Sequence, residues 1–106
     1  MYLYHATPAY NVNGIRRHGL LAKLAQGRRR CVWLHACSES LWALQHVAKR
    51  HNTRPSDCVV FRVQVDPCDV KKGPRKGLYY VMGDVPVDPV SNLKTAHEVL
   101  DGPETW

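Results

Sequence analysis

The sequence lacks several features that would place the protein in a specialised class. No stretch approaches 18 consecutive apolar residues, so we expect no membrane span. The N-terminus has no basic segment followed by an apolar run, so we expect no signal peptide. Internal repeats and low-complexity tracts are absent. Together these absences make a cytoplasmic globular protein the default expectation.

Paired cysteine motifs are also lacking. The four cysteines, Cys31, Cys37, Cys58 and Cys68, form no C-x-x-C pair and show no zinc-type spacing. Cys31 and Cys58 flank or lie within apolar runs, so we expect them to be small buried apolar residues rather than metal ligands or disulfide partners. A zinc site that combines Cys37 with His35 is the weaker alternative. We therefore expect no metal site.

Acidic residues are few, with nine Asp and Glu against fifteen Lys and Arg, which gives a net charge of +6. This balance favours partners that carry phosphate, such as a nucleotide, RNA or DNA. Charge that merely keeps a small domain soluble explains it equally well. The 106 residues suffice for one domain with one core, and an apolar fraction of 44% is typical of a folded chain.

Hydrophobic periodicity predicts the order strand, helix, strand, helix and then strands, which is an α+β fold. The expected strands cover residues 2–5, 31–36, 58–65 and 77–82, and the expected helices cover 8–18 and 40–51. Thr7 is a candidate cap for the first helix, Pro8 its first residue and Gly19 its stop. Residues 69–76 are expected to form a polar loop. We assign residues 1–94 to one domain and 95–106 to a C-terminal tail with little pattern, which could dock through Leu100 or Trp106.

The most informative stretch is Tyr4-His5-Ala6-Thr7, followed by Ile15 and then Gly19-Leu20. An apolar strand runs into a His-x-Thr turn, a short helix follows, and a glycine stops it. His5 is then expected at a strand end beside a helix start, where anionic ligands commonly bind. This arrangement predicts a nucleotide site, although His5 could also be a structural histidine without a ligand.

These residues resemble the first motif of the ADP-ribosyltransferase superfamily, in which a strand ends in His-Gly-Thr and is followed by an isoleucine and Gly-Leu. Residues 32–38, VWLHACS, look like the second motif, an apolar-aromatic-apolar strand that enters a Ser-capped helix. Residues 61–66 and 77–86 are similar in order and spacing to the later segments of the tRNA 2′-phosphotransferases. The resemblance covers roughly residues 2–90.

The resemblance implies a split, two-sheet fold with two short helices around a cleft that holds NAD. The cofactor-binding residues that we carry over are His5, Ala6, Thr7, Gly19, Leu20, Trp33, His35 and Ser38. His5 matches the histidine that hydrogen-bonds the adenosine ribose, and Thr7 supports the turn beside it. His35 lies on the same strand face as Trp33, so it either points into the cleft or is an inert neighbour.

The catalytic residues that the resemblance implies are Arg30, Trp33 and Leu78. Trp33 falls where the superfamily has a Tyr or His that packs on nicotinamide, and a flat heterocycle is held well by stacking. Arg30, or Arg29, matches an arginine that grips phosphate bidentately, although this basic run could also be a solvated loop. Leu78 falls where the protein-modifying transferases have a catalytic glutamate, whereas the phosphotransferases have an apolar residue there.

The implied reaction is attack by an RNA 2′-phosphate on the ribose carbon that bears nicotinamide, which then leaves. We therefore expect NAD as cofactor and RNA or another phosphate-bearing molecule as substrate. Two alternatives stay open, because Leu78 replaces the glutamate and the RNA-gripping residues of the phosphotransferases have no counterpart among these 106 residues. One is a non-catalytic nucleotide-binding or nucleic-acid-binding module with the same fold. The other is a small toxin or effector that modifies a host macromolecule.

Overall fold

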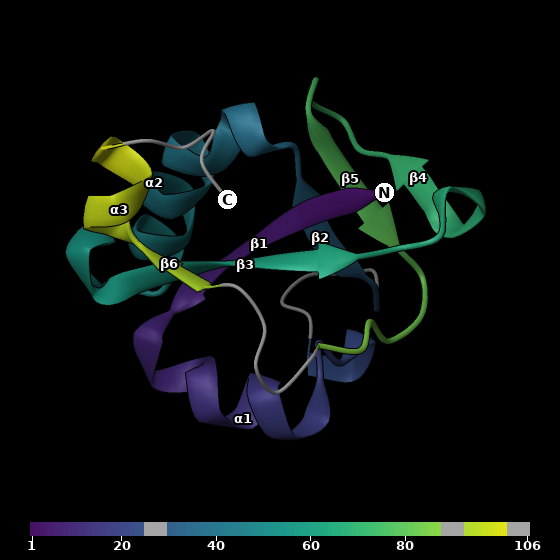
Figure 1. Ribbon diagram of the computed structural model, residues 1–106, viewed down its shortest axis with the longest axis horizontal. Helices are drawn as coiled ribbons and strands as arrows, with labels where there is room; N and C mark the ends of the chain where they lie inside the picture. Colours follow the sequence, from purple (N-terminus) through teal and green to yellow (C-terminus); the bar gives the residue numbers. More distant parts are fainter. Residues whose placement is uncertain (25–29, 88–92, 102–106) are drawn as a thin grey trace.

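The computed structural model describes residues 1–24, 30–87 and 93–101. This part of the chain forms an α+β fold, as predicted, built on one open antiparallel sheet with the strand order β4-β5-β2-β1-β3-β6 (Figure 1). The strands are β1 (Tyr2–Pro8), β2 (Val32–His35), β3 (Cys58–Gln64), β4 (Val70–Lys72), β5 (Leu78–Val81) and β6 (Leu93–Thr95).

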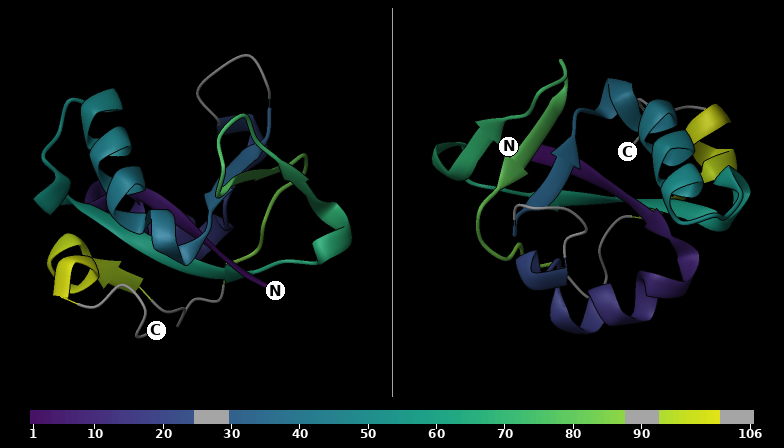
Figure 2. Two further views of the ribbon diagram at one scale, coloured as in Figure 1. Left: turned by 90° about the horizontal axis from the view of Figure 1, so that it is seen from above. Right: turned by 180° about the vertical axis from the view of Figure 1, so that it is seen from behind.

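The sheet has two wings, which are joined at a narrow point. β1 and β3 pair along seven residues, whereas β1 and β2 share the single register pair Tyr4–His35. Beyond that pair the wing formed by β1, β3 and β6 diverges from the wing formed by β2, β5 and β4 (Figure 2). The sheet is thus continuous through one residue pair, which differs from the two separate sheets that the resemblance implies.

In the part of the chain that the structure describes, three α-helices flank the sheet: α1 (Val12–His18), α2 (Ser40–Arg50) and α3 (Ala96–Asp101). Side chains alternate between the two faces of β3, as the pleat requires. Phe61 belongs to the apolar cluster against which α1 packs, whereas Val60 belongs to the cluster that contains buried residues of α2 and α3. The second face therefore carries two helices, of which α3 was not predicted from the sequence.

The start of α1 also differs from the prediction. Residues 7 and 8 belong to β1, because Thr7 pairs with Val59 of β3 and Pro8 pairs with Cys58. A single 3-10 turn, Ala9–Asn11, then leads into α1. Thr7 does not cap the helix, and its hydroxyl instead accepts a hydrogen bond of 3.1 Å from Asn11 Nδ2. The predicted stop is confirmed: Gly19 has a φ of +76°, and its N–H donates to Ile15 O at 2.7 Å.

Two segments that were expected to lack regular structure contain some. The polar loop includes β4, and residues 96–101 of the expected tail form α3. α3 packs through Val99, which is 1% exposed, and not through Leu100, which is 61% exposed. The Trp106 prediction lies outside the described residues. Within the described part, no helix combines the length and the apolar character that crossing a membrane requires.

Candidate functional site

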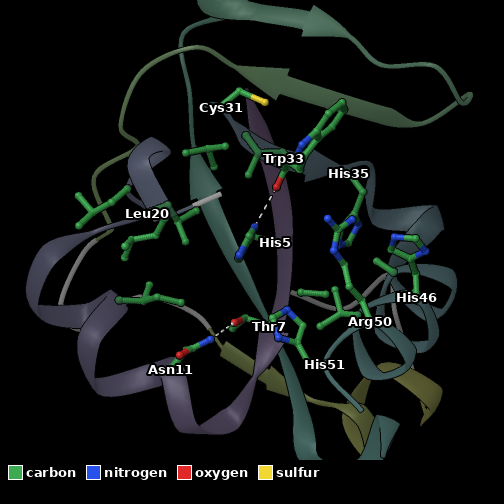
Figure 3. A pocket seen from close by; sticks show the side chains of 18 of the residues that line it. His5, Thr7, Asn11, Leu20, Cys31, Trp33, His35, His46, Arg50 and His51 are labelled. Carbon is green, nitrogen blue, oxygen red and sulfur yellow. Dashed lines mark hydrogen bonds between the residues drawn. The ribbon is translucent and has the colours of Figure 1, made fainter. Parts of the chain in front are cut away.

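A cavity of about 850 Å³ opens where the two wings of the sheet diverge (Figure 3). Its walls come from β1, β2, α1, α2 and the loop between β4 and β5. The volume lies within the range of about 300–1,000 Å³ that small-molecule and cofactor sites occupy. The narrow junction between the wings therefore creates a space large enough for a nucleotide-sized ligand.

Most of the residues singled out from the sequence line this cavity. They are His5, Ala6 and Thr7 from β1, Gly19 and Leu20 after α1, Trp33 and His35 from β2, and Leu78 from β5. Arg30 and Ser38 are exposed and are not among the lining residues. Arg30 directly precedes Cys31, which does line the cavity. Residues 28 and 29 lie outside the described residues.

The ring of His5 bridges the gap between the wings. Its Nδ1 lies 2.8 Å from Trp33 O. Because a carbonyl oxygen can only accept, Nδ1 carries the proton and donates, and Nε2 keeps its lone pair. Burial lowers the pKa of His5 below its usual value, an effect that the hydrogen bond to Trp33 opposes. Figure 3 shows the free side of this ring turned into the cavity. His5 thus presents a neutral acceptor to a ligand.

His35 repeats this arrangement on the neighbouring strand. Its Nδ1 lies 2.9 Å from Ala36 O and must donate to it. The residue is 3% exposed, and no donor in the described part of the chain reaches its buried Nε2. Burial lowers the pKa of His35 to about 4, opposed by the Ala36 hydrogen bond. The ring stacks on Tyr4 with a centroid separation of 6.1 Å, which fixes its orientation.

Trp33 provides an aromatic wall. It pairs in register with Tyr80 on β5, and the two rings lie 5.3 Å apart at an interplanar angle of 52°. Tilted ring pairs at this separation are attractive. Tyr80 therefore supports the indole, which is half-buried and lines the cavity.

One face of α2 forms a wall that the sequence reasoning did not assign to the site. Trp42, His46 and Arg50 follow one another at intervals of four residues and all line the cavity. The rings of Trp42 and His46 stack with their centroids 4.9 Å apart. The four-residue spacing of aromatic and basic residues was the available signal. It could not reveal that this face adjoins a cavity.

The loop between β4 and β5 is held against the start of α2. Arg75 places its guanidinium 4.2 Å from the centre of the Trp42 ring and forms an ion pair of 3.0 Å with Glu39. Glu39 also lies against Gly77, where an added Cβ would come within 2.7 Å of Glu39 Cγ. These contacts keep Pro74, in the same loop, at the cavity wall.

The polarity of the cavity is uneven. Five of the six histidines line it, and in the described part of the chain no Asp or Glu does. Arg50 supplies a permanent positive charge, and Figure 3 shows it with His46 and His51 on one side of the cavity, with Leu20 on the other. Tyr10, which is 69% exposed, and Asn11 also contribute and were not predicted. Such a lining suits a ligand with hydroxyl groups and negative charge.

No metal-holding group of three or more His, Cys, Asp or Glu side chains occurs within residues 1–24, 30–87 and 93–101. Cys31 and Cys58 are each 1% exposed, which confirms the expectation that they are buried. Comparison of the sequence with protein-family models finds no match, and comparison with curated proteins finds no significant one.

Proposed function

We propose that the protein is an ADP-ribosyltransferase-like domain that binds NAD and transfers ADP-ribose to a phosphate-bearing acceptor such as RNA. One observation carries this proposal. The segments 5–7, 19–20, 33–35 and residue 78 are far apart in the sequence, carry the resemblance to the superfamily, and line a single cavity. We propose that superfamily's fold as the finer description, with two wings that diverge beyond the Tyr4–His35 pair in place of two separate sheets.

The chemistry of the lining residues fits NAD. The unprotonated Nε2 of His5 can accept a hydrogen bond from a ribose hydroxyl, and the supported indole of Trp33 offers a flat face to a heterocycle. Arg50 can meet the diphosphate. NAD supplies an activated ADP-ribosyl group, because nicotinamide leaves the ribose carbon as a neutral molecule.

The protein's own contribution to the transfer is to position the reactants. His5 can hold the adenosine ribose and Trp33 can hold the nicotinamide, so NAD is anchored at both ends and the transfer becomes an oriented reaction between bound groups. The acceptor's phosphate oxygen forms the new bond to the ribose carbon. Arg30 is exposed beside Cys31, at a place where it can hold the phosphate of an acceptor that approaches from outside. The net charge of +6 favours such acceptors.

A second candidate is a module that binds a nucleotide or nucleic acid without turning it over. It is favoured by the absence of Asp and Glu from the described cavity lining, because such a site lacks an ionised carboxylate for acid–base or electrostatic work. Both candidates require nucleotide binding, and they differ in whether nicotinamide is released.

The test combines calorimetry with chromatographic detection of nicotinamide. The protein is titrated with NAD and is then incubated with NAD and a 2′-phosphorylated RNA oligonucleotide. His5→Asn retains an amide donor for Trp33 O but lacks the acceptor at Nε2, so we expect about tenfold weaker NAD binding. His97→Asn changes the histidine that does not line the cavity and serves as the matched control.

The three outcomes separate the candidates. Binding with nicotinamide release, weakened in His5→Asn but not in His97→Asn, supports the transferase. Binding without release supports the second candidate. A chain that is folded by circular dichroism and binds no NAD contradicts the transferase, and one that also fails to bind the RNA oligonucleotide contradicts both candidates.

A further inference from the structure

We propose that His35 accepts a hydrogen bond from a sugar hydroxyl of the bound substrate, and that its neutral imidazole is a buried polar anchor in a cavity whose described lining has no carboxylate. This inference rests on the proposed function and deepens it, because it names the substrate group that meets the buried end of the cavity. It adds a second acceptor to the one that His5 provides.

The direction of the acceptor follows from geometry. Nδ1 of His35 faces the carbonyl of Ala36, so the proton of the neutral ring is on Nδ1 and the lone pair is on Nε2. The ring can neither rotate nor exchange tautomers without losing that 2.9 Å bond. Stacking on Tyr4 fixes its plane, and the bond of 2.8 Å from Ala36 N to Gly77 O holds the end of β2 in place. Nε2 is therefore a pre-oriented acceptor.

The position of His35 links it to the other site residues. It pairs in register with Tyr4 on β1 and with Leu78 on β5, so it lies where the two wings meet. Side chains of directly opposite residues in antiparallel strands share one face of the sheet. His35 and Leu78 both line the cavity. At this point of the wall His35 supplies a polar atom and Leu78 an apolar surface.

The unpaired state of Nε2 indicates what it binds. A buried acceptor without a donor is unfavourable, and such groups in folded proteins call for an explanation. A hydroxyl group can donate to it, whereas a phosphate oxygen or carboxylate would place a second lone pair against it. Rotamer changes of the side chains around the ring, which are common on binding, give a ligand access to Nε2 while the His35 ring keeps its place. The complementary group is thus a hydroxyl donor, and within NAD the ribose hydroxyls are of this type.

The same contact would assist the proposed transfer. A hydrogen bond to a hydroxyl next to the reacting sugar carbon strengthens when positive charge grows on the sugar in the transition state. His35 can give this assistance as a neutral acceptor. It needs no proton transfer, because the ring keeps its Nδ1 proton throughout.

Two variants of matched size test the role of the Nε2 atom. His35→Asn keeps an amide N–H near the position of Nδ1 and removes the acceptor, whereas His35→Gln places an amide oxygen near the position of Nε2. With ADP-ribose as the probe in calorimetry, we expect about tenfold weaker binding for His35→Asn and a loss within about threefold for His35→Gln. Release of nicotinamide from NAD should follow the same order, with a larger loss in kcat for His35→Asn.

Nitrogen-15 NMR of the wild-type imidazoles is the second measurement and depends on neither variant folding nor turnover. At neutral pH we expect His35 to show a protonated Nδ1 and an unprotonated Nε2, with the Nε2 resonance shifting when ADP-ribose is added. A protonated Nε2 in the free protein, or an Nε2 resonance that stays unchanged while other site resonances shift, overturns the proposal.

The outcomes also separate this proposal from the function on which it rests. If the wild-type protein binds neither ADP-ribose nor NAD, both fail. If it binds them and releases nicotinamide while His35→Asn behaves like the wild type, the assignment of His35 fails and the proposed function stands.

Discussion

The two wings of the sheet differ in construction. β1 and β3 pair along seven residues, and five of the seven residues of β3 are buried. In the other wing, β2 has four residues, β5 is mostly half-buried, and Lys71 and Lys72 of β4 are exposed. The strands of the first wing thus contribute more buried apolar residues than those of the second, whereas the second presents the Trp33 and His35 rings to the cavity. We infer that stability depends mainly on the first wing and ligand binding mainly on the second.

The largest expected effect comes from the first wing. Phe61 is fully buried in β3, and Phe61→Ala should lower the free energy of unfolding by about 3–5 kcal/mol through lost burial and the cavity left behind. Urea denaturation followed by circular dichroism measures this. Leu100→Ala, at a residue that is 61% exposed, is the control and should change stability by less than about 0.5 kcal/mol. Equal effects of the two substitutions would contradict the assignment of the core to this wing.

The second effect concerns pH. His35 has a pKa of about 4 in the folded protein against 6.5 for an ordinary histidine. The unfolded chain therefore binds more protons between these values, so the stabilisation is complete above pH 6.5 and is lost as the pH falls towards 4. The free energy of unfolding should fall by about 3 kcal/mol over this range. Two nearby groups modify this pKa: the charge of Glu39 raises it, and His5 lowers it. Burial also lowers the pKa of His5 itself, so His5 adds to the loss of stability at acidic pH.

Denaturation curves between pH 4 and pH 7.5 test this expectation. His35→Asn removes the titrating group and should give a flatter dependence of stability on pH than the wild type. A wild-type protein with the same free energy of unfolding at pH 4.5 and pH 7 would show that the His35 ring is not held neutral by burial.

The smallest effect on stability should come from Trp33. Its indole is half-buried, so Trp33→Ala should reduce the free energy of unfolding by about 1–2 kcal/mol. NAD binding should weaken about tenfold or more, because a stacking surface is lost. Trp33→Phe keeps an aromatic face beside Tyr80 and should recover most of the affinity. Calorimetry measures the affinity of both variants for NAD. An unchanged affinity in Trp33→Ala would show that the second wing does not contribute to NAD binding.

The sequence predicted the parts of the fold that local patterns specify. The alternation in residues 58–65 predicted β3, and Gly19 predicted the end of α1. β4 was missed because its residues are mainly polar, and it depends on pairing with β5. α3 was missed because six residues show too little periodicity for a helical pattern. In both cases tertiary contacts, and not local preference, stabilise the element.

The site was predicted to a similar extent. The motif residues His5, Trp33 and His35 line the cavity, because strand ends bring their side chains together. The α2 wall was missed, since the spacing of Trp42, His46 and Arg50 does not say which neighbour that face adjoins. Only the divergence of β1 from β2, a property of the whole sheet, places a cavity there.

That divergence has a mechanical consequence. Within each wing the strands are bound by a ladder of backbone bonds, whereas β1 and β2 are joined by the stacked residue pair Tyr4–His35 and by the bond from His5 to Trp33. One apolar cluster, however, contains Leu3 of β1 together with Leu34 of β2. A ligand that spreads the wings must therefore act against this shared interior as well as against the few bonds of the seam, which limits how thick a ligand the chamber accepts.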